Sequence, residues 1–121
     1  MTPFGAKLRE LRAARGKTLK DMAAAIGVSG AYLSALEHGN RGAPSWYLLQ
    51  RIIGYFNVIW DEAEELERLA RVSSPRVVVD TSGLAPEATE FANRLAAEIK
   101  SLDAEDLRAL MAALSARAGK N

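Results

Sequence analysis

The sequence predicts a mainly α-helical protein, with seven helices and one short strand along its 121 residues. Apolar residues recur at spacings of three and four through most of the chain, which is the period of an amphipathic helix. Thr, Ser or Asp stands before several of these stretches and Gly follows several, as is typical of helix starts and stops. The run from Val77 to Val79 is β-branched throughout and favours a strand.

The first helix is expected over residues 3–15, because Thr2 is a natural N-cap and Pro3 suits a first helical turn. A fourth helix is expected to start near Ser45, and a fifth to cover about 59–72. Trp46 is expected in or beside the core. The residues of these three helices that are expected to face the core are Phe4, Leu8, Leu11, Leu49, Ile52, Ile53, Phe56, Ile59, Trp60, Ala63, Leu66 and Leu69.

Residues 18–39 predict two short helices joined by a tight turn, which is the shape of a helix-turn-helix. Thr18 can cap the first helix, and Gly27 can take the positive φ that ends it. Ser29 can cap the second, which ends at Gly39. Because a helix-turn-helix lays its second helix in the major groove of DNA, duplex DNA is the expected partner. The residues expected to point outward are Gly30, Ala31, Ser34, Ala35 and His38.

Several segments match one known family in register. They are Leu8-Arg9-Glu10-Leu11-Arg12, Ile26-Gly27-Val28-Ser29, Tyr32-Leu33-Ser34, Leu36-Glu37 and Phe56-Asn57-Val58, with Thr18, Met22-Ala23, Gly39 and Pro44 between them. Across residues 4 to about 66 the chain resembles the phage repressor and Cro-like helix-turn-helix proteins, also called the xenobiotic-response-element (XRE) family. The resemblance implies a five-helix, lambda-repressor-like DNA-binding bundle over residues 1–72. It also implies a sequence-specific transcriptional regulator, with repression as the expected mode.

The resemblance further implies which residues contact DNA. Outward residues of the third helix meet base edges in the family, and here they are small. Gly and Ala cannot make bidentate hydrogen bonds to bases, so either the helix approaches thymine methyl groups closely or specificity comes from DNA shape. Leu19 is a second departure, since the family often has Gln there. Flanking residues are expected to contact phosphates; Arg41 beside Gly42 is a candidate for a minor groove, and His38 is either a surface residue or a phosphate contact. The candidate DNA-binding residues are Lys17, Thr18, Ser29, Gly30, Ala31, Tyr32, Ser34, Ala35, His38, Asn40 and Arg41.

A structural ion pair is implied by the same family pattern, between Arg12 in the first helix and Glu37 at the end of the third. This pair is expected to be partly buried and to set the orientation of the third helix. Loss of one partner strands a charge, at a cost of ~3 kcal/mol or more. Arg12 is therefore expected to act on the fold rather than on DNA.

The net charge of +1 conceals an uneven distribution. Residues 1–60 hold eight basic and three acidic residues, a balance of +5, whereas residues 61–121 hold eight basic and twelve acidic ones, a balance of −4. A basic half suits a polyanion such as DNA, and this half holds the helix-turn-helix. The basic residues expected to be solvated charges are Lys7, Arg9, Arg15 and Lys20.

A second region, for dimerisation, is expected over residues 73–121, after a short Ser-Ser-Pro linker at 73–75. Residues 76–81 are predicted to form a strand, and no second strand is evident in the sequence. A lone strand leaves backbone groups unpaired, so its expected partner is the same strand of another copy, antiparallel about a twofold axis. The alternative is an extended connector packed on its own domain.

Two helices are expected to follow, at about 86–101 and 103–117, with a frayed tail from Ser115 onward. Asp103 is the expected cap of the second helix. Each helix carries an apolar stripe that needs a partner, so the pair is expected to form a hairpin that packs against a second subunit. An isolated interaction arm for a different protein is the alternative. The expected dimerisation residues are Val77, Val78, Val79, Phe91, Leu95, Ile99, Leu107, Leu110 and Leu114.

Composition excludes several classes of function. Cys is absent, which excludes disulfides, thiolate metal sites and cysteine nucleophiles. The single His, and the lack of a Gly-rich phosphate loop, give no support for catalysis, and the acidic run 61–67 is expected to be the exposed start of a helix. No catalytic residue, metal or cofactor is therefore expected. Without a signal peptide or an apolar run of ~20 residues, a cytoplasmic protein that does not enter a membrane is expected.

Three classes of function stay open. The first is a homodimeric DNA-binding repressor. The second is an antitoxin that autoregulates its promoter and binds a toxin through its C-terminal helices. The third is an interaction module that does not bind DNA. Salt-dependent binding to duplex DNA separates the third class from the others, and co-purification with a small toxin separates the second from the first.

Overall fold

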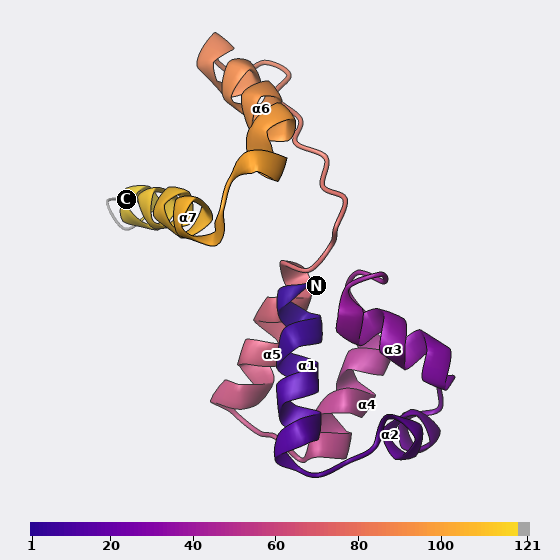
Figure 1. Cartoon of the computed structure of the whole chain (residues 1–121). Helices are drawn as coiled ribbons and strands as arrows, with labels where there is room; N and C mark the ends of the chain where they lie inside the picture. Colours follow the sequence, from indigo (N-terminus) through magenta and orange to yellow (C-terminus); the bar gives the residue numbers. More distant parts are fainter. Residues whose placement is uncertain (119–121) are drawn as a thin grey trace. The chain divides into compact units, whose positions relative to one another are not determined.

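The computed structural model describes residues 1–118, which divide into two compact units, Met1–Val77 and Val78 onward. The first unit contains α1 (Pro3–Ala14), α2 (Leu19–Ile26), α3 (Gly30–His38), α4 (Trp46–Phe56) and α5 (Asp61–Arg71) (Figure 1). The second unit contains α6 (Pro86–Glu98), the 3-10 helix η1 (Ile99–Ser101) and α7 (Ala104–Ala118).

Side-chain caps start four of the five helices in the first unit. In each case a hydroxyl oxygen accepts a hydrogen bond from the backbone N–H three residues further on. The distances are 3.0 Å for Thr2, Thr18 and Ser29 and 3.2 Å for Ser45. Gly27 and Gly39, with φ of 79° and 81°, stop α2 and α3 in a left-handed conformation that favours Gly.

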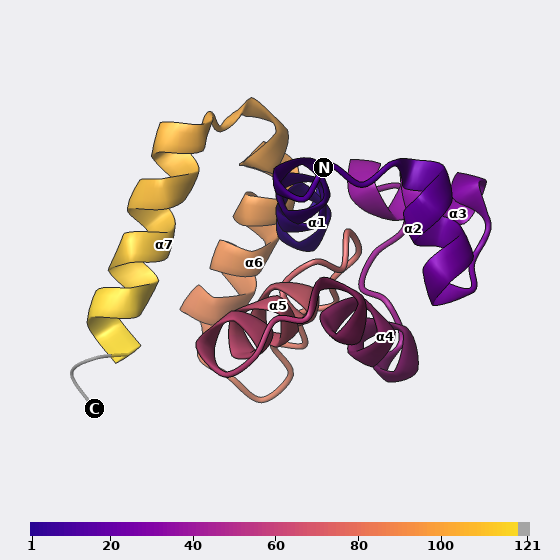
Figure 2. The same ribbon diagram turned by 90° about the horizontal axis from the view of Figure 1, so that it is seen from below.

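One hydrophobic core holds these five helices together. α1 packs against α3 and α5, α2 packs against α3 and α4, and α4 packs against α5. As a result α2 and α3 lie at one end of this unit and α5 at the other (Figure 2). The large apolar side chains that are fully buried are Phe4, Leu8, Met22, Leu33, Leu36, Ile52 and Leu66.

Three side chains expected in or beside the core are exposed instead. Ile59 and Trp60 precede α5 rather than forming part of it, and Trp60 is 81% exposed. Trp60 has a φ of +55°, so the helix begins only at Asp61, and Val58 is the buried residue of this loop. Trp46 is exposed because other residues fill the inward face of α4, namely Leu48, Leu49, Ile52 and Phe56.

The expected strand at residues 76–81 is wrong. Within residues 1–118 no segment forms a β-strand, and this one is extended without a partner. Val77, Val78 and Val79 are all exposed, Val78 by 94%. β-branched residues favour an extended backbone, but a strand also requires hydrogen bonds to a neighbouring strand, which the described part of the chain does not supply. The segment is an exposed connector.

Ser73, at the start of the expected linker, is packed into the first unit. Its hydroxyl donates to the carbonyl oxygen of Leu69 at 2.6 Å and accepts from the N–H of Phe4 at 2.9 Å. The Phe4 N–H is one of the first amides of α1, which have no partner within their own helix. Ser73, two residues after the end of α5, therefore helps to cap the start of α1 and is buried there.

The first helix of the second unit, α6, begins at Pro86. The helix expected to reach residue 101 is α-helical only to Glu98 and tightens into η1. Asp103 caps α7, because its Oδ1 accepts from the N–H of Asp106 at 2.8 Å, while Asp106 Oδ2 accepts from the N–H of Asp103 at 3.2 Å. Residues 115–118, expected to fray, are helical, and residues 119–121 of that tail lie outside the described residues.

Candidate nucleic-acid interface

α3 has one face in the core and one face free of the rest of the chain. Leu33, Leu36 and Glu37 are buried. On the free face, Gly30, Ala31 and His38 are exposed, and Tyr32, Ser34 and Ala35 are half-buried. Except for Tyr32 and His38 the free face consists of very small side chains, so the backbone of α3 can come close to a partner surface.

Nothing within the fold requires Gly at position 30, the first residue of α3. A Cβ built on Gly30 meets no atom within 4 Å, and the residue does not have a positive φ. Gly in a helix is less stable than Ala by about 0.5–1 kcal/mol. The absence of a side chain here therefore leaves room in front of α3 without helping the fold.

The back of α3 is tied to α1 by an ion pair. Arg12 Nε donates to Glu37 Oε2 at 2.8 Å, and Arg12 Nη2 donates to Glu37 Oε1 at 3.1 Å. The side chain of Glu37 is 1% exposed and that of Arg12 is 24% exposed. Arg12 Nη1 also donates to the carbonyl oxygen of Lys17 at 3.1 Å, so one guanidinium joins α1, the α1–α2 loop and α3. The hydrogen bond to Glu37 raises the pKa of Arg12, which keeps the pair ionic.

α1 and α3 also meet backbone to backbone at Gly5. A Cβ on Gly5 would lie 2.6 Å from the carbonyl oxygens of Leu36 and Glu37, a distance that only Gly allows. The sequence analysis missed this contact. The one available signal was a Gly inside an otherwise regular helix, which often marks close packing. Together with the ion pair, the contact fixes how far α3 stands from α1.

Candidate contact residues lie on both sides of the free face of α3. Lys17 and Thr18 come directly before α2 and are exposed, as are Asn40 and Arg41 after α3. His38 Nδ1 lies 2.8 Å from the carbonyl oxygen of Ser34, and because a carbonyl oxygen only accepts, Nδ1 carries the hydrogen. Nε2 of His38 makes no hydrogen bond within residues 1–118 and is available to a partner.

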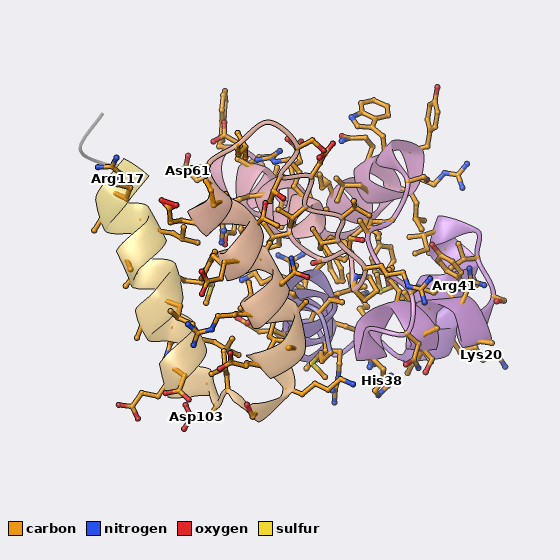
Figure 3. All side chains as sticks on the ribbon, turned by 90° about the horizontal axis from the view of Figure 1, so that it is seen from above. Lys20, His38, Arg41, Asp61, Asp103 and Arg117 are labelled. Carbon is orange, nitrogen blue, oxygen red and sulfur yellow. The ribbon has the colours of Figure 1, made fainter. Side chains whose placement is uncertain are left out.

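The most acidic segment of the first unit lies away from α3. Lys20 in α2 and Arg41 after α3 are positively charged, and Asp61 lies well away from both (Figure 3). Asp61, together with two further carboxylates, forms the acidic first turn of α5. Because α5 packs on α1 and α4, its negative charge is remote from the free face of α3 and does not oppose the approach of a polyanion there.

Two basic side chains of this unit are occupied by the fold. Arg15, expected to be solvated, donates to the carbonyl oxygen of Phe56 and lies over the Phe56 ring, 5.5 Å from its centroid. Arg51 donates to the carbonyl oxygen of Ile26 at 3.3 Å. These contacts fasten α1 and α2 to α4, so both arginines add to the positive field of the unit without being free to clamp a phosphate.

The second unit leaves several of the expected dimerisation residues uncovered. Phe91, Ile99, Leu110 and Leu114 are exposed, and Leu95 and Leu107 are half-buried. An open groove of about 360 Å³ is lined by four apolar residues, Phe91, Leu95, Leu102 and Leu110, together with Glu87, Glu90, Arg94 and Glu98.

Residues 1–118 lack two further features, a cluster of metal-ligating side chains and a membrane-spanning helix. No group of three His, Asp or Glu side chains in this range is arranged to hold a metal ion. None of its helices combines the length and the apolar character that crossing a membrane requires.

A five-helix bundle with a helix-turn-helix, a bare third helix and basic surroundings defines a DNA-binding protein of the helix-turn-helix class. A family model described as "Helix-turn-helix domain" matches residues 3–72, more than half of the chain, and the chain belongs to this family. This match agrees with the resemblance to XRE-type helix-turn-helix proteins, and the family and its fold are those of non-enzymatic DNA-binding proteins.

Two similar proteins accompany this match. The Bacillus subtilis (strain 168) protein described as uncharacterized HTH-type transcriptional regulator RghRB is 38% identical over 61 residues, which make up 50% of this chain and 44% of that protein. The chain thus spans less than half the length of this relative. A chain of a solved SinR protein/SinI protein complex is 22% identical, with a TM-score of 0.43 over 82% of this chain and 99% of that one.

Proposed function

We propose that the protein is a homodimeric transcriptional repressor that lays α3 of each subunit in the major groove of its operator. The observation that carries this proposal is the construction of α3. Its back is locked to α1 by the Arg12–Glu37 pair and the close approach at Gly5, and its front is bare. A rigid helix with a bare front suits close contact with base edges. Repression is supported by the resemblance to phage repressors.

The proposed base-facing residues are Gly30, Ala31, Ser34 and Ala35. Such short side chains read a sequence through contact with thymine methyl groups or through the shape and deformability of the duplex. The proposed backbone contacts come from both edges of the helix-turn-helix. They are Lys17, Thr18, Ser29, His38, Asn40 and Arg41, which fix the position of the protein on the duplex without reading its bases, and Tyr32 supports them from the first turn of α3.

We also propose that residues 73–121 form the dimerisation region, distinct from a DNA-binding domain over 1–72. Support comes from the uncovered apolar residues of α6 and α7, since exposed apolar clusters often mark sites of association. Val77, Val78 and Val79 are further proposed dimerisation residues, because they are exposed apolar side chains of the connector. A dimer of this kind presents two copies of α3 to successive major grooves, about 34 Å apart.

Selection of bound fragments from a random duplex pool, with the intact chain, tests this function. We expect enrichment of a palindromic sequence whose half-sites are about 10 base pairs apart, and the mass of a dimer in light scattering. Affinity should fall steeply as salt rises, because bound phosphates release counterions. Failure to enrich any sequence over random competitor, at modest ionic strength, would overturn the proposal.

An antitoxin is the second candidate. The observation that favours it is the groove in the second unit, whose lining combines four apolar side chains with three carboxylates and can be covered by another protein. Purification of the intact chain from its native cells separates the two candidates. A stable homodimer without further components supports the regulator, and a small protein that stays bound through the groove supports the antitoxin.

A further inference from the structure

A cation–π contact joins the loop after α3 to the first turn of α3. The guanidinium carbon of Arg41 lies 5.5 Å from the centroid of the Tyr32 ring, within the range of a favourable contact. Tyr32 is the third residue of α3, and Arg41 follows the Gly39 cap by two residues. The Arg41 side chain therefore extends back along the flank of the helix.

Both ends of this contact are held in place. The N–H groups of Asn40 and Arg41 donate to the carbonyl oxygen of Ala35 at 2.9 and 3.2 Å. Gly39 packs so closely on the N-terminus that a Cβ there would lie 2.7 Å from the Cα of Met1. Tyr32 is half-buried and packs against the hydrophobic core. The stack thus connects two fixed points, one in the first turn of α3 and one just beyond its C-terminal cap.

Arg41 differs from Arg12, Arg15 and Arg51 in what its N–H groups do. Those three donate to carboxylate or carbonyl oxygens of the chain. The exposed Arg41 side chain makes no hydrogen bond and no ion pair within residues 1–118. Stacking occupies the flat face of a guanidinium and leaves its edge, with a rigid fork of N–H donors, free for a phosphate.

We propose that Tyr32 positions the Arg41 guanidinium so that its free edge clamps one DNA phosphate beside α3. This inference rests on the proposed function, since it requires α3 to lie against a duplex. The clamp sets how deeply α3 enters the groove. The base-facing side chains cannot do this, because they are too short. Arg41 is the phosphate ligand, and Tyr32 is a positioning residue that acts through it.

The test measures affinity by fluorescence anisotropy, with a labelled duplex that the wild-type chain selects from a random pool, at NaCl concentrations from about 50 to 300 mM. The variants are Arg41→Gln, Arg41→Lys, Tyr32→Leu, Tyr32→Phe and the double variant with Arg41→Gln and Tyr32→Leu. Arg108→Gln, at an exposed position of α7, is the matched control for loss of one positive charge outside the first unit.

Arg41→Gln should weaken binding at least about tenfold and reduce the slope of log K against log salt by about 1.8, because each subunit of the proposed dimer loses one phosphate contact worth about 0.9. Arg41→Lys should keep the slope but lose several-fold in affinity, because an ammonium has no flat face to stack. Tyr32→Leu should weaken binding about three- to fivefold and Tyr32→Phe by less than about twofold, since Phe keeps the ring. In the Arg41→Gln background Tyr32→Leu should have no further effect, and Arg108→Gln should leave the slope unchanged.

The clamp is overturned if Tyr32→Leu causes the same loss of affinity in the wild-type and Arg41→Gln backgrounds. It is also overturned if the salt slope of Arg41→Gln equals that of the wild type. A loss in Arg41→Gln that is confined to duplexes with A·T-rich flanks would also overturn it, because that pattern indicates insertion into a minor groove. Circular dichroism checks that Tyr32→Leu is folded. If Tyr32→Leu is unfolded, the affinities of Arg41→Lys and Tyr32→Phe decide whether the clamp exists. A wild-type chain that selects no duplex overturns the proposed function as well, whereas the variant results concern the clamp alone.

Discussion

Replacement of Arg12 by Ala should destabilise the first unit strongly. The variant leaves the carboxylate of Glu37, 1% exposed, without the two hydrogen bonds that it receives from Arg12. Removal of one partner of a buried ion pair costs about 3–5 kcal/mol. Because the Arg12 side chain is 24% exposed, water can enter the vacated site, so we expect the lower end, about 3 kcal/mol. For a domain of this size that loss lowers Tm by about 12–24 °C.

Arg68→Ala is the matched control for this prediction. Arg68 donates to Glu65 through two hydrogen bonds of 2.9 and 2.7 Å, in a geometry as good as that of Arg12 and Glu37. Both arginines lie in helices and both variants lose the same atoms, but the side chains of Arg68 and Glu65 are 55% and 43% exposed. Water screens the charges of an exposed pair, so Arg68→Ala should cost far less stability than Arg12→Ala.

Urea denaturation of both variants, followed by circular dichroism, gives the two losses in the free energy of unfolding. Equal losses would refute the reasoning, since the two pairs differ mainly in burial. Well below its Tm, Arg12→Ala should bind DNA with the salt slope of the wild type, because Arg12 is bonded to the fold rather than to a phosphate.

Three further predictions concern packing and assembly. Gly5→Ala places a methyl group 2.6 Å from two carbonyl oxygens and should lower stability by about 1–3 kcal/mol. Gly54→Ala, where a Cβ meets nothing within 4 Å, should raise stability by about 0.5–1 kcal/mol. Thermal melts in which the Tm of both variants shifts in the same direction would contradict this. Ser73→Ala leaves an α1 N–H buried without an acceptor and should cost about 1–3 kcal/mol in urea denaturation, against less than about 0.5 kcal/mol for the exposed Ser74→Ala, and similar costs would argue against the contact. Phe91→Asp should convert the proposed dimer into a monomer in light scattering, and a variant that remains dimeric would place the interface elsewhere.

The starts of the helices were predictable because capping is local. Thr2, Thr18, Ser29 and Ser45 each accept a hydrogen bond from an amide only three residues away, so their role can be read from neighbouring residues. The free face of α3 was predictable for a similar reason, since the helical period decides which residues turn inward.

The errors and omissions arise where distant or irregular contacts decide. Residues 76–81 have the composition of a strand, but strand formation depends on a partner that the described part of the chain does not provide. Trp60 continues the helical spacing of α5, yet its positive φ places it before the helix. The contact of Ser73 with Phe4 spans 69 positions and the stack of Arg41 on Tyr32 crosses a whole helix, so no local pattern announces either.

The central claim is that α3 lies against the bases of duplex DNA, and the affinity of Ala31→Glu tests it most directly. Ala31 is the exposed second residue of α3, where the helix dipole favours a carboxylate, so the fold should keep its stability. Ala97→Glu makes the same change of charge at an exposed position of α6. With the selected duplex, we predict that Ala97→Glu binds as the wild type does, while Ala31→Glu loses at least about tenfold in affinity because its carboxylate faces a polyanion. Wild-type affinity in a folded Ala31→Glu variant would contradict the account.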